Sequence, residues 1–480
     1  MRKYGFAAFL ILISFSASAQ RYILQNTGTL YDSFENPAQR AFIPDSSRYL
    51  AFNFLIPNGG ADIFIKGNAQ GTIKTRLLAD HYRWDSRYLT IGEGNYTRVG
   101  AYANEYIVMA KLFGKVGSNS EYGFSIQARA DGYARLSDES FVLFDDYKRF
   151  PENRYENIFN DRFYHQAWSQ ISFTYKEDLS KYAGIGIKLS ALSGTVYSNL
   201  NIRRSSLTID PAEKYLDISM GGTYVTSFAA SRFENRTLYP RFTNPGAAVT
   251  FGGWVKEPET GITFQGNVKD LGFIHWRQDS AMVSEFNRSR RVEDIEGNGQ
   301  ESNILKGVMT ILQSRPVQNS FTRPIDSRFE GMMSKPFYFT GDKSLIYKPT
   351  VILSKHFFDN RFNAAVLNQL TYHNVSGTIS TTIDNNSVFA VGGQFMIKSP
   401  NVDFFIGSES LYESYQGTKA IAGSNTARAH NFRSYSGASF FFGFAAKFGN
   451  IIETPPNASY IPMGEKGFFG KLWNRWFKAE

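Results

Sequence analysis

The chain of 480 residues contains no cysteine. It therefore has no disulfide framework and no thiolate metal site, and it lacks the cysteine that an N-terminally lipidated lipoprotein requires. Beyond the N-terminal segment there is no apolar run of the roughly 18 residues that a membrane-spanning helix needs. The mean hydropathy is −0.31. Proline is scarce, at 16 residues. These absences exclude a bundle of transmembrane helices.

Aromatic residues and glycine are abundant instead. The chain has 43 Phe, 27 Tyr, 6 Trp and 41 Gly. This composition, together with the negative mean hydropathy, is typical of a membrane β-barrel. The residues of such a barrel alternate between lipid and water, and its aromatic residues gather at the two membrane interfaces. An array of secreted β-sandwich domains is the competing interpretation.

The segment Ser439–Gly449 carries the clearest alternation of side chains. One face is aromatic, and the other holds small residues and ends in a lysine. A strand with lipid on one side and a wet lumen on the other has this pattern. The aromatic face comprises Phe440, Phe442, Phe444 and Phe448.

Similar alternation in residues 121–136, 182–197 and 261–276 predicts polar side chains that face the lumen. Arg129 and Asp131 have opposite charges two residues apart, so we expect them to pair there. The candidate lumen-facing residues are Ser125, Gln127, Arg129, Asp131, Lys188, Thr263, Gln265 and Asn267.

The order of these patterns predicts the domain organisation. Residues 1–19, with Arg2, Lys3, an apolar run and the sequence Ala17-Ser18-Ala19, read as a cleaved signal peptide, with an uncleaved anchor as the alternative. Residues 20–47 form a hatch-like N-terminal segment. Residues 48–449 form an all-β, antiparallel outer-membrane barrel of about 14 strands with long loops.

Within the barrel, residues 50–56 and 61–66 are expected to pair as a hairpin. Residues 68–104 and 137–164 are expected to be long loops. Residues 277–333 are expected to be an irregular insertion with one short helix at 303–313, where apolar residues recur at helical spacing.

A periplasmic tail, residues 450–480, follows the predicted barrel. From residue 467 it has aromatic and basic residues at helical spacing, which predicts a short amphipathic helix. Such a helix can lie on the membrane surface, dock into a partner protein or fold onto its own barrel. The candidate docking residues are Phe468, Phe469, Leu472, Trp473, Trp476 and Phe477.

Two motifs resemble a known superfamily. Asn36-Pro37-Ala38 resembles an element near the start of FadL-like barrels, in which fourteen strands enclose an N-terminal hatch. That superfamily includes fatty-acid transporters and PorV, a subunit of the type IX secretion system. The segments Tyr31–Asp45 and Asn267–Trp276 are more specifically similar to an uncharacterised barrel family of Bacteroidota, and the second also to PorP-like proteins.

Patterns that carry chemistry do not stand out. The six His residues are scattered without metal-ligand spacing, and no Gly-x-Ser-x-Gly motif occurs. We therefore expect no enzyme, no cofactor and no metal site. The net charge is +9, but the basic residues form no stripe with interleaved aromatic residues. We therefore expect no nucleic-acid partner.

The expected partners are outer-membrane lipids and other envelope proteins. The favoured function is an accessory subunit of an envelope machine for protein export or assembly, as the PorV likeness implies. The alternative is a FadL-like channel for hydrophobic small molecules, as the superfamily implies.

Overall fold

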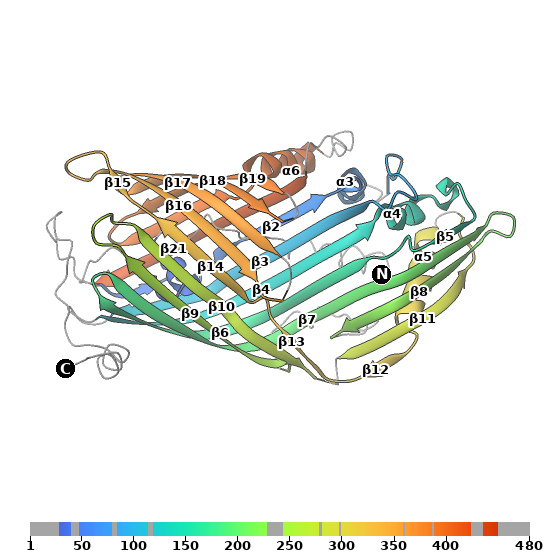
Figure 1. The fold of residues 1–480 in the computed structure, drawn as a ribbon, viewed down its shortest axis with the longest axis horizontal. Coiled ribbons are helices and arrows are strands. Elements are labelled where there is room, and N and C mark those ends of the chain that lie inside the picture. The colour runs from blue at the N-terminus through green and yellow to red at the C-terminus, as the bar shows by residue number, and fades with distance from the viewer. Residues whose placement is uncertain are drawn as a thin grey trace.

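The computed structural model describes residues 28–39, 48–78, 84–113, 119–227, 243–277, 281–296, 299–358, 361–385, 388–423 and 435–449. The predicted signal peptide and tail lie outside these residues. Most described residues form antiparallel strands wrapped into one barrel (Figure 1). The wall strands are β1 (Arg48–Phe52), β2 (Asn58–Lys66), β3 (Tyr96–Phe113), β4 (Ser120–Ser137), β6 (Arg162–Ser180), β7 (Ala183–Asp210), β9 (Pro245–Lys256), β10 (Thr263–Trp276), β13 (Phe321–Pro324), β14 (Arg328–Ser334), β16 (Leu345–His356), β17 (Phe362–Tyr372), β18 (Val375–Asp384), β19 (Phe389–Lys398), β20 (Val402–Ser408) and β21 (Ser436–Gly449).

The wall closes because the last strand pairs with the first. Strand β21 runs antiparallel to β1 and β2, and both of these also pair with β3. The ladder continues through β4, β6, β7, β9, β10, β14, β16, β17, β18, β19 and β20 back to β21. With β1 and β2 sharing one position, and β13 and β14 another, the barrel has 14 strands, which confirms the prediction.

The two faces of the wall differ as the alternation in β21 predicts. Phe440 and Phe448 are 51% and 44% exposed, whereas the intervening Phe441 is 1% exposed. Exposed apolar side chains also cover the other strands, and they give the barrel the apolar outer surface that contact with lipid requires. Examples are Phe124, Leu189, Phe264, Met333, Val366, Ile379 and Phe395.

The predicted hairpin of residues 50–56 with 61–66 is wrong. Both β1 and β2 pair with the same neighbours, β3 and β21, so they are two parts of one wall position. The residues between them bulge outward, with Phe54 51% and Leu55 63% exposed. Their backbones are left-handed, with φ of 52° and 60°. The ring of Phe54 packs on the outward-facing Phe448.

Two side-chain amides repair the ladder at this bulge. Asn53 accepts a hydrogen bond from the Met109 amide at 2.9 Å and donates to the Ile107 carbonyl at 3.0 Å. Asn58 accepts from the Phe444 amide at 2.8 Å and donates to its carbonyl at 2.9 Å. Each asparagine thus satisfies backbone groups of a neighbouring strand, which hydrocarbon would otherwise leave without partners.

The two ends of the barrel differ in their connections. At the short-turn end, tight turns join β6 to β7, β9 to β10, β17 to β18 and β19 to β20. At the long-loop end, extended connections join β2 to β3, β4 to β6, β7 to β9, β10 to β13 and β20 to β21 (Figure 1). The short strand β15 (Phe337–Tyr338) pairs with β16 near the short-turn end. Among the described residues, no helix is long and apolar enough to cross a bilayer.

A cap of additional elements covers the long-loop end (Figure 1). Strand β7 extends beyond the wall, and there it pairs with β5 and β8, while β8 pairs with β11 and β11 with β12. The cap has its own apolar core, which includes Phe141, Leu207, Ile218, Phe286 and Ile304. Its elements are α3 (Gln70–Leu78), α4 (Asp138–Asp145), η1 (Tyr147–Arg149), β5 (Arg154–Glu156), β8 (Tyr215–Thr226), β11 (Met282–Val292), α5 (Gln300–Leu312) and β12 (Pro316–Gln318).

Several segments are therefore more regular than their sequence predicts. Residues 277–333 contain β11, α5, β12, β13 and most of β14, and α5 lies where a helix at 303–313 is expected. Residues 68–104 contain α3 and the start of β3, and residues 137–164 contain α4, η1, β5 and the start of β6. The outer positions of β11 are charged or polar, because this strand packs in the cap and not against lipid.

The stability of the cap depends on pH because the cap contains a buried carboxylate, that of Asp161. Asp161 accepts hydrogen bonds from the Ser137 amide at 2.8 Å and the Ser140 hydroxyl at 2.6 Å, at the start of α4. Burial raises the pKa of the Asp161 carboxyl to about 6. The folded cap therefore binds a proton at a higher pH than the unfolded chain, so this group adds stability as the pH falls through 6.

We expect amide exchange in α4, corrected for its intrinsic pH dependence, to show about 1 kcal/mol more protection at pH 5 than at pH 7.5. The substitution Asp161→Asn should flatten this dependence, because it removes the buried titrating group. The matched substitution Glu156→Gln, at an exposed position of β5, should leave it intact. Equal pH dependence in Asp161→Asn and the parent would contradict this assignment.

Candidate functional site: the plugged barrel interior

Residues 28–39 form a segment inside the barrel, here called the plug. It contains the short helix α2 (Asp32–Glu35), and every plug residue from Thr29 to Gln39 is buried. Apolar contacts hold one side of it: Leu30, Tyr31 and Phe34 pack with wall residues of β3, β20 and β21. The predicted hatch-like segment 20–47 is described over these twelve residues, and they lie within the barrel.

Glu35 fastens the plug to two sides of the wall. Its Oε1 accepts hydrogen bonds from Asn104 at 2.9 Å and Tyr106 at 2.7 Å, both on β3. Its Oε2 forms an ion pair with Lys269 on β10. Its backbone carbonyl accepts a bond from Asn267 at 3.2 Å. The plug therefore spans the interior from β3 to β10.

The motif Asn36-Pro37-Ala38 lies close against two glycines of the wall. The Asn36 side chain accepts a hydrogen bond from the Ala38 amide at 3.1 Å, which holds a tight turn. A Cβ atom at Gly186 of β7 would lie 2.3 Å from the Pro37 carbonyl oxygen. A Cβ atom at Gly252 of β9 would lie 2.2 Å from the Asn36 side-chain oxygen. The two glycines therefore form the seat of this turn.

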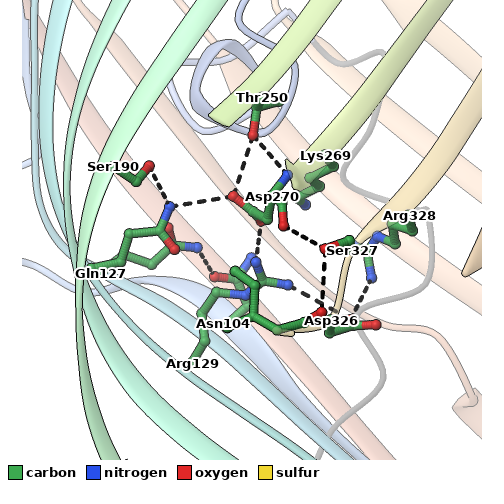
Figure 2. Close-up of polar contacts among 12 residues, drawn as sticks. Asn104, Gln127, Arg129, Ser190, Thr250, Lys269, Asp270, Asp326, Ser327 and Arg328 are labelled. Atoms are coloured by element: carbon green, nitrogen blue, oxygen red, sulfur yellow. Dashed lines mark hydrogen bonds and ion pairs between the residues drawn. The ribbon is translucent and has the colours of Figure 1, made fainter. Parts of the chain in front are cut away.

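Asp270 is the centre of a polar network beside the plug (Figure 2). It lies at a bulge of β10, with a left-handed φ of 51°, where the register against β9 shifts. Its carboxylate forms ion pairs with Arg129 and, at 3.5 Å, with Lys188. It also accepts bonds from Gln170 and Thr250, each at 3.3 Å. The bulge thus directs one carboxylate toward β4, β6, β7 and β9.

A second carboxylate, Asp326, joins the network between β13 and β14. It contacts His356 at 2.5 Å, Arg361 at 3.2 Å and Arg328 at 3.7 Å. The guanidinium of Arg361 also donates two bonds to Asp131, at 2.7 and 2.8 Å. Charge-assisted bidentate contacts of this kind are strong and directional, so they fix the wall strands around the interior.

Charge balance ties the plug to this network. The wall contributes the cations Arg129, Lys188, Lys269, Arg328 and Arg361, against the carboxylates Asp131, Asp270, Asp326 and Glu330. The plug adds two buried carboxylates, Asp32 and Glu35, and Glu35 pairs with Lys269. Removing one partner from a buried ion pair typically costs about 3–5 kcal/mol. The interior is therefore built to contain the plug.

The structure places the predicted lumen-facing residues as follows. Six of the eight are buried inside the barrel: Ser125, Gln127, Arg129, Asp131, Lys188 and Asn267. Thr263 and Gln265 are half-buried. The network brings together Arg129, Asp131 and Lys188, whereas Asn267 contacts the plug.

The expected pairing of Arg129 with Asp131 is wrong. Arg129 pairs with Asp270 and Asp326, and Asp131 pairs with Arg361. A spacing of two along a strand puts two side chains on one face and allows them to pair, as Arg328 and Glu330 do at 2.6 Å on β14, but the partners of Arg129 and Asp131 come from other segments. The partners of Arg129 and Asp131 lie more than 100 residues away from them in sequence.

One cavity beside the plug is small. A cavity of about 10 Å³ lies between the plug and the wall, which is about the room that one water molecule needs. Its lining includes Asp32, Glu35, Gln265, Asn267 and Glu330. Among the described His, Asp and Glu side chains, no group of three or more is placed to hold a metal ion.

Sequence reasoning missed the central residues Glu35, Asp270, Asp326 and Arg361. A partial signal existed for Asp270, because it lies in the motif Asn267–Trp276. The structure explains that motif further. A Cβ at Gly272 would lie 2.3 Å from a carbonyl oxygen of β9, and Trp276 is fully buried against Gly194.

Comparisons with known proteins place the chain in a family. A family model described as "Family of unknown function (DUF5723)" matches residues 62–409. No curated protein matches the chain. The translocator domain of the autotransporter NalP from Neisseria meningitidis is 9% identical, with a TM-score of 0.31, over 85% of this chain and 91% of that chain. The toluene transporter TbuX from Ralstonia pickettii is 8% identical, with a TM-score of 0.43, over 86% and 92%. At these scores neither likeness informs function.

We expect the substitution Gly252→Ala to displace the plug, because the added methyl group would overlap the Asn36 side chain. Hydrogen exchange of peptides covering residues 28–39 should become faster by at least about tenfold. The adjacent Gly253→Ala is the control, since a Cβ there would meet only one atom, at 3.9 Å. Equal exchange in the two variants would show that the turn does not seat on Gly252.

Proposed function

The chain belongs to the DUF5723 family, and we propose that it is a non-catalytic outer-membrane β-barrel that serves as an accessory subunit of an envelope machine for protein export or assembly. The observation that carries this proposal is the plug. It makes ionic, polar and apolar contacts to β3, β10, β20 and β21 inside the described barrel, next to a cavity of about 10 Å³. Such an interior favours a scaffold over an open conduit.

The distribution of loops supports a role in binding other proteins. Outer-membrane barrels have short periplasmic turns and longer external loops. By this rule the cap lies outside the cell, and the chain after β21 continues into the periplasm. The cap has an apolar core of its own, so it is a folded surface and not a set of separate loops. The tail of residues 450–480 lies outside the described residues, and its aromatic and basic sequence pattern predicts a second binding surface.

We expect a variant that lacks residues 467–480 to fold as a barrel but to lose associated envelope proteins during purification in mild detergent. Comparative mass spectrometry of the parent and truncated proteins measures this loss. A control variant with Lys471→Gln and Lys478→Gln keeps the aromatic residues, and it separates loss of charge from loss of the whole segment. Full retention of every partner by the truncated protein would contradict docking through the tail.

A channel for hydrophobic small molecules is the alternative, favoured by the polar and ionic contacts that Glu35 of the plug makes with the wall. Water can replace the polar contacts of Glu35 with the wall, whereas Leu30, Tyr31 and Phe34 would lose their apolar contacts when the plug moves. For the scaffold, we expect the parent protein to show no steady conductance in planar lipid bilayers and Gly252→Ala to conduct. Steady conductance by the parent would contradict the scaffold function, and no conductance in either protein would contradict the plug as the closing element.

A further inference from the structure

The barrel wall has a gap in its strand ladder at the long-loop end. Strand β20 ends at Ser408, which pairs with Gly393 of β19. On its other flank, β20 pairs with β21 up to Phe441. Beyond these points, no described strand lies between residues 389–392 of β19 and residues 436–440 of β21. An uncovered strand edge facing hydrocarbon is strongly unfavourable, so this gap requires another cover.

The helix α6 (Leu411–Gly423) covers the gap (Figure 1). The hydroxyl of Ser414 accepts a hydrogen bond from the Ser439 amide at 2.8 Å and donates to the Ser439 carbonyl at 3.2 Å. One serine therefore replaces both backbone bonds that a neighbouring strand would make there. One turn further along, a Cβ on Gly417 would lie 3.5 Å from the Gly437 carbonyl oxygen.

Contacts with the wall place α6 on the outer face of the barrel. At its start, Leu411 lies over Gly393, where an added Cβ would be 2.8 Å from the leucine Cδ1. Gly393 lies on the same face of β19 as Val391 and Phe395, whose side chains are 39% and 46% exposed on the lipid side. Further along, Gly417 approaches Ala438, which lies on the same face of β21 as the outward-facing Phe440. The helix thus rests on the side of the wall that faces lipid.

The free face of α6 has the residue order of a membrane-interface anchor. Leu411 is 47% exposed, Tyr412 54% and Tyr415 59%. The Lys419 ammonium lies 5.6 Å from the centre of the Tyr415 ring. Leu411 sits at the level of Ile379, the 62%-exposed residue that pairs with Gly393 in the middle of the wall. From there the helix runs toward the long-loop end, where Gly417 meets Gly437 at the start of β21.

We propose that α6 is a lipid-binding part of the barrel wall. Ser414 seals it to β21, and its free face inserts into the outer leaflet. Leu411 contacts acyl chains, Tyr412 and Tyr415 lie at the boundary with the head groups, and Lys419 reaches the phosphates. Aromatic residues favour this boundary, and lysine extends its ammonium group toward water. The occupant of this face is lipid, and not a second copy of the chain or a partner protein.

Nitroxide labels on introduced cysteines test the proposal directly, because the chain has no cysteine of its own. The full chain is reconstituted into phosphatidylcholine–phosphatidylglycerol vesicles with Leu411→Cys, Tyr415→Cys or Lys419→Cys. Ile379→Cys serves as the lipid reference and Arg290→Cys, exposed in the cap, as the water reference. Collision rates with oxygen and with a nickel chelate measure depth. We expect a deep label at 411, an intermediate one at 415 and a shallow one at 419.

Two results would overturn the proposal. Nickel accessibility at 411 and 415 equal to that of the cap reference would place α6 in water. Protection from both oxygen and nickel would show that protein covers this face. The variant Tyr412→Cys provides a second measurement of depth if one of the other variants fails to insert.

The seal has its own matched pair of variants. The substitution Ser414→Ala removes both bonds to Ser439, so exchange of the Ser439 amide should become about tenfold faster. The control Thr418→Ala removes a hydroxyl of the same helix that donates only to the Ser414 carbonyl, at 2.8 Å. Unchanged exchange in Ser414→Ala would contradict the seal.

Discussion

The need to pair every backbone polar group within hydrocarbon is the constraint on which the rest of this structure depends. A closed ring of 14 strands meets it almost everywhere. Where the ladder is interrupted, a short polar side chain takes the place of a strand: Asn53 and Asn58 at the bulge between β1 and β2, and Ser414 where β20 stops early. At these three positions the wall tolerates irregular backbone because a side chain satisfies the groups that a strand would otherwise pair.

The interior follows a different rule, because charge balance governs it. Arg129 and Lys188 share Asp270, and Lys269 pairs with Glu35. Buried ion pairs add little net stability compared with apolar packing, yet misplacing one partner is costly. Glu35 thus sets the position of the plug along the barrel, while Leu30, Tyr31 and Phe34 contribute the apolar contacts. Gly186 and Gly252 add steric definition, since larger residues would exclude the Asn36–Ala38 turn.

The sequence predicted those features that depend on local periodicity. Alternation in β21 and in residues 121–136 identified membrane strands, and helical spacing identified the region of α5. The same alternation could not show that β8 and β11 belong to the cap, since pairing partners are not encoded in one strand. It also could not pair Asp131 with Arg361 or Glu35 with Lys269, which lie 230 and 234 residues apart. The left-handed Asp270 was likewise hidden, because a bulge shifts register without a strong sequence signal.

Together these constraints locate where function must be sought. The ion pairs of the described interior join the wall strands to one another and to the plug. Surfaces with unmatched character lie elsewhere: the exposed, arginine-rich positions of β11 in the cap, and the free aromatic face of α6 on the outer wall. Both surround the long-loop end, and both are held by elements that interrupt or extend the regular ladder. In the scaffold function that we propose, the departures from an ideal barrel are the candidate recognition surfaces, and the regular wall and the plug are the support that holds them in place.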